Sequence, residues 1–551
     1  MTTNLLPARR ALALLLAATA AFAAGTARAD AAGSWAPATR LAEGSYTQPG
    51  GVAVAPDGTV TAAFSRRDDS PMANHVEVAV KPPGGTFGQP ARLSSSGAAG
   101  LPWLVGDEQG NVAIVWTEQL AGTTTIRGTT KRAGGGFAPV QTISDTGSYA
   151  DFPRVDMAGG IAVVAWSQGG RVRAATAHAG ESFKVHDPLS GSIGFSNAPV
   201  VAVAPDGAAV VGWDKAISGT GGIHAAARTA TGEFAPLRDV AQLPASESYP
   251  GFASTLRIAM SAEGRATLAW TYWDKDAHNY RLQAASRGRT GEFGGVENVA
   301  QFDSGYGGHF ALDKAVDGTA LLVWADHQLK YALRPEGGGF GATQAVAGSS
   351  PTSWVPQAKF GADGTARAVW EGAYAGRQSV ETARIAPDGS SSYAEDIAVP
   401  ATQAETSDSF GGLYGLDVDA HGDAAVSWAH FADVLPGPGT DYRRALEVRI
   451  LDATPPALSG VQVPEHALTG SAVAMSATAT DALSPVTIRW KLGKYLTAQG
   501  PAITHTYDAP GRFGVDVTAT DAAGNTVQAT RFVDVAPGPA GPACPVGQVC
   551  E

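Results

Sequence analysis

One short hairpin pattern recurs along most of this chain, and it constrains the fold more than any other feature. The stretch "VAVAPDGAAVVGWD", residues 201–214, is an apolar run, a Pro-Asp-Gly turn and a second apolar run that ends near a tryptophan. Tight hairpin turns favour Asp-Gly dipeptides because glycine adopts a positive φ at little cost. Related second runs, spaced 46 to 58 residues apart, end at Phe64, Trp116, Trp166, Trp213, Trp270, Trp324, Trp370 and Trp428.

Each repeat reads as four antiparallel strands. A loop, a third run, a glycine-rich turn and a fourth run follow the tryptophan, as in "HAAARTATGEFAPLRDVA". Repeated four-stranded units of about 50 residues are typical of β-propeller blades. A solenoid is the structural alternative, but its repeats are usually shorter and its ends need caps.

The two ends of the repeat region favour a ring. The last unit stops after its third strand, "RRALEVRILD", and the early segment "SWAPATRLAEG" matches the fourth-strand pattern. This segment is therefore predicted to complete the last blade, with Trp35 and Ala38 beside Leu446 and Val448. We predict an all-β fold with a closed β-propeller over residues 33–452, in which eight four-stranded blades are favoured and seven are the alternative.

The repeats resemble those of secreted bacterial sialidase-like β-propellers. The likeness rests on strings such as "APDGAAVVGW", which echo the Ser-x-Asp-x-Gly-x-x-Trp box of that family. Enzymes of the family also carry an Arg-Ile-Pro motif. That string is absent here, and the nearest one, "FPRV" around Arg154, lies in the third unit. The resemblance implies the scaffold, while the catalytic motif departs from the family pattern.

A second β module follows the repeats. The proline pair in "DATPPALSGVQVP" predicts an extended linker at residues 453–457, and alternating strands continue over residues 458–536. This region resembles the PKD domain, an immunoglobulin-like β-sandwich, through its core-type Trp490 and the string around Tyr507. The resemblance implies a spacer or a second contact site. Lys491 stands close to where many members have acids, so no metal loop is expected.

The N-terminal segment predicts export, and export in turn affects how the C-terminal cysteines are interpreted. An arginine pair, a short apolar stretch and a small-x-small site predict a secretory signal peptide over residues 1–29. The apolar stretch falls short of the ~20 residues that a membrane-spanning helix needs. The Pro/Gly-rich tail, residues 537–551, carries Cys544 and Cys550. In an exported protein such a pair favours a disulfide over a metal site.

The charge of the chain disfavours nucleic acid as a partner. The formal net charge is −12 and becomes −15 when the signal peptide is removed, whereas nucleic-acid binding relies on lysine and arginine. We therefore expect a secreted, extracellular monomer with no membrane insertion after cleavage. Its expected partner is a glycan or protein of the cell surface or the extracellular space.

Ligand-binding residues are predicted on one face of the ring. The Asp-Gly turns are short and uniform, whereas the loops at the opposite ends of the strands are longer and differ, and variable loops on a rigid scaffold carry function. Aromatic rings beside carboxylates suit sugars, whose C–H faces stack on rings while their hydroxyls donate to acids. The predicted binding residues are Tyr46, Tyr149, Tyr249, Tyr306, Trp354, Tyr414, Glu118, Asp214, Asp274, Asp326 and Glu371.

The sequence contains no strong catalytic motif. A Gly-x-Ser-x-Gly elbow, a His-Glu-x-x-His pair and a phosphate-binding glycine loop are absent, so no catalytic residue and no cofactor is predicted. This predicts a non-enzymatic binding or adhesion protein. The alternative is a sialidase-like glycoside hydrolase or a polysaccharide lyase whose acids come from several blades. A third possibility is an envelope protein stabilised by structural calcium.

Overall fold

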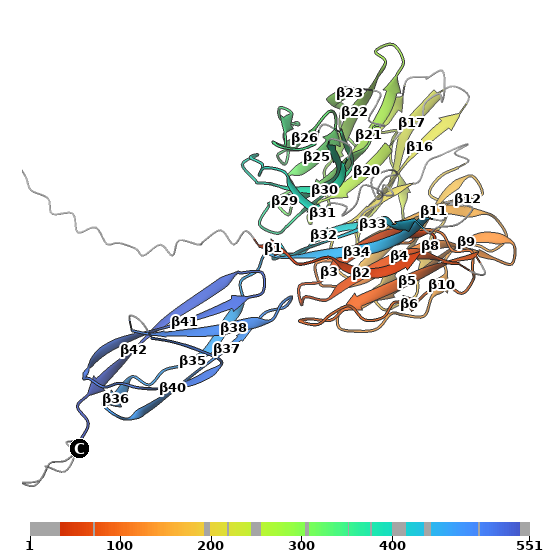
Figure 1. The fold of residues 1–551 in the computed structure, drawn as a ribbon. Helices are drawn as coiled ribbons and strands as arrows, with labels where there is room; N and C mark the ends of the chain where they lie inside the picture. The colour runs from red at the N-terminus through yellow and green to blue at the C-terminus, as the bar shows by residue number, and fades with distance from the viewer. Residues whose placement is uncertain are drawn as a thin grey trace, which may run out of the picture.

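The computed structural model describes residues 33–539, except for residues 70–71, 192–198, 218–219, 244–254, 304–307, 351, 375–376, 399–414, 435–441 and 494–495. The predicted signal peptide and the predicted disulfide between Cys544 and Cys550 lie outside these residues. The described chain is all-β and forms a body of sheets followed by an elongated C-terminal domain (Figure 1). Within the described ranges, no helix has the length and apolar character needed to cross a membrane.

The body consists of eight antiparallel sheets, and seven of them are built from strands consecutive along the chain. The strands of the first four sheets are β3 Thr47–Val54, β4 Val60–Asp69, β5 Met72–Lys81 and β6 Ala91–Arg92; β7 Trp103–Gly106, β8 Val112–Leu120, β9 Thr123–Lys131 and β10 Gln141–Thr142; β11 Ala150–Ala158, β12 Ile161–Gln168, β13 Arg171–His178 and β14 Lys184–Val185; and β15 Val200–Val203, β16 Ala209–Ile217, β17 Thr220–Arg228, β18 Ala235–Pro236 and β19 Ala241–Leu243.

The other four sheets follow the same plan. Their strands are β20 Thr255–Met260, β21 Ala266–Asp274, β22 Asn279–Arg287 and β23 Glu297–Asp303; β24 Phe310–Lys314, β25 Ala320–Ala325, β26 Leu329–Arg334 and β27 Gln344–Ala345; β28 Thr352–Phe360, β29 Ala366–Tyr374, β30 Arg377–Ile385 and β31 Glu395–Ala398; and β32 Gly415–Val418, β33 Ala424–Val434 and β34 Tyr442–Asp452 with β1 Ser34–Trp35 and β2 Thr39–Gly44.

The core of the body lies between neighbouring sheets. The second strand of each sheet is flanked on both edges and carries the repeated aromatic residue, which is Phe64 in the first sheet and tryptophan in the others. Trp116, for example, is fully buried among residues of the first and second sheets, including Val76 and Ile114. Large aromatic side chains bury the most apolar area per residue, which explains why this position is repeated.

The N-terminal segment completes the eighth sheet, as predicted. Trp35 of β1 pairs with Leu451 of β34, and Ala42 of β2 pairs with Leu446 of the same strand. The first strands of consecutive sheets lie side by side along the chain, and β32 of the eighth sheet lies beside β3 of the first. Thus the first and last sheets of the body are neighbours in space.

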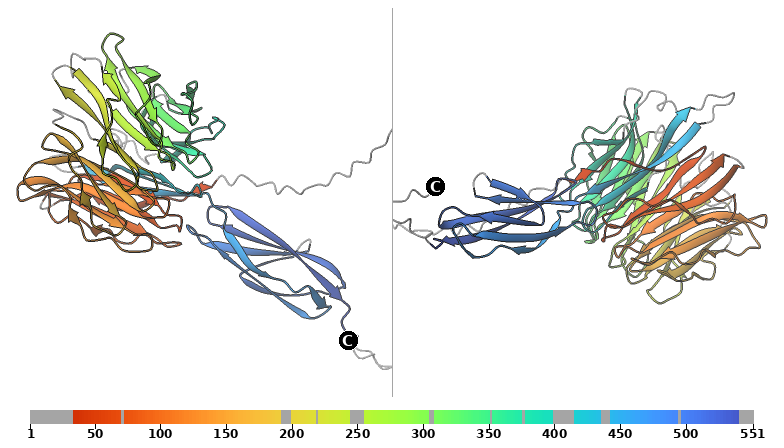
Figure 2. Two further views of the ribbon diagram at one scale, coloured as in Figure 1. Left: turned by 180° about the vertical axis from the view of Figure 1, so that it is seen from behind. Right: turned by 60° about the horizontal axis from the view of Figure 1, so that its bottom comes forward.

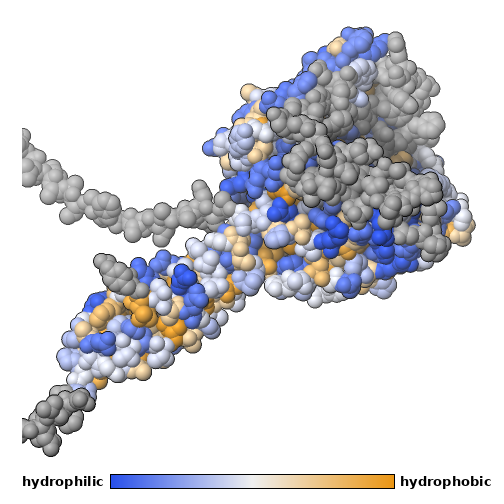
Figure 3. Space-filling view, viewed as in Figure 1, coloured by the Kyte–Doolittle hydropathy of each residue, from blue (hydrophilic) through white to orange (hydrophobic). Residues whose placement is uncertain are grey.

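The C-terminal domain is a two-sheet sandwich that extends away from the body in both views of Figure 2. Fully buried Trp490 and Val517 lie in the cluster that joins its sheets. Hydrophobic residues gather on its surface in Figure 3, and Phe532 is half exposed. Its strands are β35 Ala457–Gln462, β36 His466–Leu468, β37 Ala472–Thr480, β38 Val486–Leu492, β39 Leu496–Gln499, β40 Ala502–Thr506, β41 Gly511–Asp521 and β42 Thr526–Ala536.

Candidate functional site

The first strands of the eight sheets bring residues from distant parts of the chain to matching positions. In each sheet, the residue just before the repeated aromatic residue of the second strand pairs with one residue of the first strand. These eight first-strand residues form one layer: Gly51, Trp103, Arg154, Val200, Arg257, Ala311, Gln357 and Gly415. The residue two positions later defines a second layer: Ala53, Val105, Asp156, Ala202, Ala259, Asp313, Lys359 and Asp417. Side chains two positions apart share one face of a strand, so both layers project from the same face.

We call Arg154, Arg257 and the nearby His309 the cationic cluster. The Arg154 guanidinium lies 3.8 Å from the centre of the Trp103 ring, and its Nη1 donates to the Pro153 carbonyl at 2.9 Å. The Arg257 Nη1 donates to the Leu256 carbonyl at 2.9 Å. Neither guanidinium has an ion pair with a carboxylate among the described residues. Two arginines in one layer without carboxylate partners are suited to an anionic ligand.

Burial and charge repulsion lower the pKa values of the residues in the cationic cluster. Burial, followed by repulsion from Arg257, lowers the pKa of Arg154 to about 9, while Asp151 opposes this change. Burial also lowers the pKa of Arg257. Burial and then the charge of Arg257 lower the pKa of His309. At neutral pH the His309 imidazole is therefore uncharged and able to accept a proton.

Backbone irregularities lie directly before this layer in the third and seventh sheets. The pairing of β11 shifts between Asp151 and Arg154, and Phe152 has a φ of 56°. The pairing of β28 shifts between Trp354 and Gln357, and Val355 has a φ of 41°. Positive φ is costly for non-glycine residues, most of all for a β-branched one. Such bulges redirect the side chains that follow them.

Asp156, Asp313, Lys359 and Asp417 form the second group, which we call the acidic cluster. The charge of Asp313 is the main cause of the raised pKa of Lys359, and Asp417 and Asp156 add to it. Burial raises the pKa of Asp417 to about 6, with Lys359 opposing the rise. Asp156 belongs to the third sheet and Lys359 to the seventh, so first strands four sheets apart approach closely enough for their charges to interact.

The three aspartates also link neighbouring sheets by the same hydrogen bond. Asp156 Oδ2 accepts from the Val203 backbone N–H at 2.8 Å, and Asp313 Oδ2 accepts from the Phe360 N–H at 2.8 Å. Asp417 Oδ2 accepts from the Val54 N–H at 2.9 Å. The last of these bonds joins the eighth sheet to the first.

Most of the acids predicted to bind a ligand are buried or are paired with other groups of the protein. Glu118 is fully buried and accepts hydrogen bonds from the Trp116 indole N–H and two serine residues. Asp214 is also fully buried. Asp274 pairs with an arginine of the next strand at 3.0 Å and Asp326 with a nearby lysine at 2.7 Å. Glu371 is partly buried and lies opposite Trp354 in the ladder.

The predicted aromatic residues are described in part. Tyr149 is 62% exposed, and its hydroxyl donates to Asp151 Oδ2 at 2.7 Å, next to the cationic cluster. Tyr46 lies beneath the guanidiniums of Arg67 and Arg444, at 5.1 and 5.7 Å. Tyr249, Tyr306, Tyr414 and the cysteines Cys544 and Cys550 lie outside the described residues, as does the side chain of Trp354.

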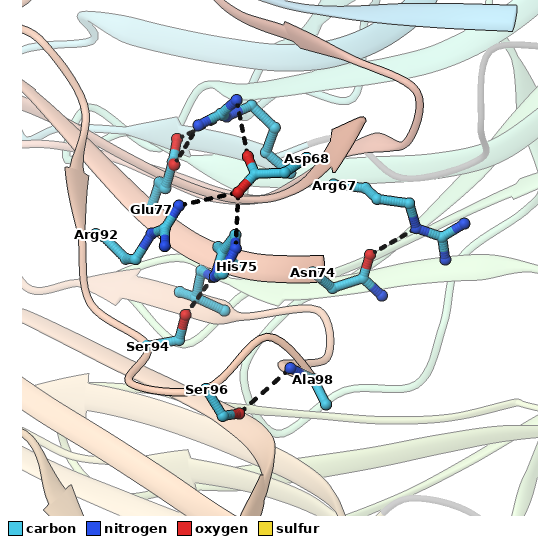
Figure 4. Close-up of polar contacts among 11 residues, drawn as sticks. Arg67, Asp68, Asn74, His75, Glu77, Arg92, Ser94, Ser96 and Ala98 are labelled. Atoms are coloured by element: carbon cyan, nitrogen blue, oxygen red, sulfur yellow. Dashed lines mark hydrogen bonds and ion pairs between the residues drawn. The ribbon is translucent and has the colours of Figure 1, made fainter. Parts of the chain in front are cut away.

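A dense polar network joins β4, β5 and β6 of the first sheet (Figure 4). Asp68 contacts Arg66 at 3.3 Å, Arg92 at 3.2 Å and the His75 Nε2 at 2.9 Å. Arg66 also donates twice to Glu77, at 2.8 and 3.1 Å. The charged groups of Asp68, Arg66 and Glu77 thus pair with one another, so the network stabilises the first sheet.

Neither cluster is predicted by the sequence analysis. Arg154 appears there only in the string nearest to the Arg-Ile-Pro motif, and Arg257, His309 and the acidic cluster match no motif considered. A usable signal exists in strings such as "LRIAM", "ALDKA" and "QAKFG", where a charged residue interrupts an apolar first strand. Buried charges are expensive and need a partner or a function.

A second acidic group lies where the body meets the C-terminal domain. Carboxylate oxygens of Asp452, Asp481 and Asp521 lie within 4.8 Å of one another. Oxygen ligands of this kind suit Ca²⁺. Two of these carboxylates also accept hydrogen bonds from side chains. Ser484 donates to Asp452 at 2.6 Å, and Asn525 donates to Asp521 at 2.8 Å. The sequence suggests structural calcium only as a general possibility and does not single out these three aspartates.

Comparisons with solved structures return enzymes as well as other proteins. Polysaccharide lyase Uly1 aligns at 10% identity and a TM-score of 0.38, covering 62% of this chain and 88% of its own. A PL25 ulvan lyase aligns at 11% identity and a TM-score of 0.35, covering 54% and 81%. A eukaryotic initiation factor aligns at 10% identity and a TM-score of 0.37, covering 70% and 84%.

The prediction of a non-enzymatic binding or adhesion protein is corrected by the presence of polysaccharide lyases among these structures, because that class was the alternative. At such low TM-scores the alignments do not identify a substrate or a catalytic residue for this chain. No curated protein matches the chain. The sialidase-like resemblance is not confirmed, whereas residues 459–535 match the family model described as PKD domain, which confirms the predicted C-terminal module.

Proposed function

We propose that the eight sheets form a closed eight-bladed β-propeller whose axis is lined by the first strands. The position of β32 beside β3 supports this proposal. The Asp417–Val54 hydrogen bond supports it further, because it repeats the bonds that join interior pairs of sheets. In a closed ring the cationic and acidic clusters are successive layers around one axis.

We also propose that the mature chain is exported and cleaves an acidic polysaccharide by β-elimination. The observation that carries this proposal is the cationic cluster: two arginines without carboxylate partners beside a histidine whose pKa is lowered. A hydrolase would need two available carboxylates. The carboxylates in the next layer instead interact with Lys359.

The chemistry follows from these groups. The guanidiniums of Arg154 and Arg257 would bind the C5 carboxylate of a uronic acid, which acidifies the neighbouring C5–H. His309 would accept this proton, the electron pair would form the C4–C5 double bond, and the C4–O4 bond would break. The departing O4 would take up a proton from a donor at the mouth of the site. The exposed Tyr149 is placed to pack against a neighbouring sugar.

A panel of uronate polysaccharides tests this function. The mature protein should degrade at least one of polygalacturonate, alginate, glucuronan or hyaluronan and raise the ultraviolet absorbance of the unsaturated product. His309→Asn should lower the rate about 100-fold or more, and Arg257→Gln should do the same. His178→Asn, at an exposed histidine of β13, is the matched control and should keep the full rate. Degradation unaffected by His309→Asn or Arg257→Gln would contradict the proposal.

A further inference from the structure

A polar cavity lies on the body away from both clusters. It has a volume of about 750 Å³ and is lined by the Asp-Gly-type turns of the seventh and eighth sheets, β1 and the start of the linker. These turns lie at the end of the first strands opposite to the cationic cluster. The cavity is therefore distinct from the proposed catalytic site.

Two arginines face this cavity. The guanidinium of Arg367 lies 5.4 Å from the centre of the Trp35 ring, and that of Arg384 contributes to the same lining. Among the described residues, neither guanidinium has a hydrogen bond or an ion pair. Burial, followed by repulsion from Arg384, lowers the pKa of Arg367 to about 10, and Glu395 opposes this change. The two cations thus repel each other, and an anion placed between them would relieve that repulsion.

Two aromatic side chains line the same cavity. Tyr393 is 73% exposed, and it is held in place because its ring packs on the backbone of Gly348, where a Cβ atom would overlap the ring. The indole N–H of Trp35 is buried and has no hydrogen-bond partner among the described residues. Buried donors are rarely left unsatisfied without a reason. A ligand oxygen in the cavity would provide the missing acceptor.

We propose that this cavity is a second, non-catalytic binding site for an acidic sugar unit. The sugar ring would stack on Tyr393, its carboxylate or sulfate would bind Arg367 and Arg384, and a hydroxyl oxygen would accept from Trp35. Exposed Glu395, which lines the same cavity, would accept hydrogen bonds from hydroxyl groups of the sugar. The site would hold a polysaccharide at the end of the body opposite to the catalytic cluster, and it does not depend on how that cluster acts.

Calorimetric titration of the full mature chain tests the second site. The background is the double variant Arg257→Gln and His309→Asn, so that binding at the cationic cluster does not obscure the result. Trigalacturonate tests a carboxylate ligand, a sulfated trisaccharide tests a sulfate ligand, and inorganic sulfate and maltotriose test the anion and the neutral sugar alone. We expect one of the two acidic trisaccharides to bind. Inorganic sulfate and maltotriose should each bind more weakly than that trisaccharide.

Variants then locate the site. Arg384→Gln should weaken binding about tenfold, because a charge-assisted hydrogen bond is lost, and Tyr393→Ala should weaken it similarly. Arg489→Gln, at an exposed arginine of the C-terminal domain, should leave binding unchanged. No binding of either acidic trisaccharide in the background variant, or binding unaffected by Arg384→Gln and Tyr393→Ala, would overturn the inference. The lyase activity of the unaltered chain is judged separately, so failure of one proposal leaves the other intact.

Discussion

Glu118 illustrates how a single buried carboxylate supports the repeated tryptophan. Burial alone would raise the pKa of Glu118, but hydrogen bonds from Ser96, Ser95 and Trp116 outweigh it, and the net pKa is lowered. The Arg127 Nε also lies 3.3 Å from this carboxylate. The same role is taken by Gln168 for Trp166 and by Glu381 for Trp370. In these three sheets the buried indole N–H therefore has its own side-chain acceptor.

This role predicts a large effect of Glu118→Ala on stability. The variant leaves several buried donors without an acceptor and should lower the free energy of unfolding by about 2–4 kcal/mol. Denaturant unfolding followed by tryptophan fluorescence measures the change. Asp274→Ala is the control, because it breaks a partly exposed pair with Arg281 and should cost less than about 1 kcal/mol. Equal losses in the two variants would refute the structural role of Glu118.

At the scale of the strand, the second layer determines how neighbouring sheets are joined. A first strand that carries aspartate in this layer accepts a backbone N–H from the first strand of the next sheet. Where the layer holds alanine or valine, as at Ala53 and Val105, this side-chain link cannot form. The link between β32 and β3 is therefore the element-scale evidence on which closure depends.

Hydrogen exchange tests that link. Asp417→Ala should speed exchange of the Val54 amide by about fivefold, because a net hydrogen bond contributes about 1 kcal/mol. Asp156→Ala breaks the equivalent bond to Val203 and should speed exchange there without affecting Val54. Exchange at Val54 that is the same in the unaltered chain and in Asp417→Ala would contradict closure through this bond.

Much of the architecture was predictable at the scale of the element, but little of the site was. The eight hairpins, the buried tryptophans and the pairing of Trp35 with the last sheet follow from local pattern, because strand periodicity and turn chemistry are written within each repeat. The cationic cluster combines residues of the third, fifth and sixth sheets. Its members are brought together only by the arrangement of whole sheets, which no local pattern encodes. Glu118 and Asp214 follow the repeated tryptophans and are therefore predicted to lie in exposed loops. They lie in strands instead and are buried.

At the scale of the whole molecule, the joint between the body and the C-terminal domain is acidic. Burial raises the pKa of Asp452 to about 7, and the charges of Asp481, Asp423 and Asp521 add to the rise. Burial, followed by the charge of Asp419, raises the pKa of Asp423 to about 6. Lys81 donates to the Leu483 carbonyl at 3.3 Å across the same joint. The single positive charge of Lys81 does not balance the negative charges of these carboxylates.

The joint should therefore lose stability as the pH rises. A raised folded-state pKa means that stability is fully present below the unfolded-state value, near pH 4, and is lost as the pH rises through about 6 to 7. Asp452→Asn should raise the melting temperature at pH 8 but change it little at pH 5, because the protonated acid and the amide are both neutral. Thermal unfolding at the two pH values measures this. A melting temperature lowered by Asp452→Asn at pH 8 would contradict the sign.

The central claim is that residues from separate sheets meet around one axis to bind and cleave an acidic sugar. A crystal structure of His309→Asn with an oligosaccharide of the polysaccharide that the unaltered chain degrades tests it most directly. The account predicts a uronate carboxylate within hydrogen-bond distance of both Arg154 and Arg257, with C5 facing residue 309. An oligosaccharide bound with its carboxylate away from both arginines, or first strands that do not surround a common axis, would contradict the account.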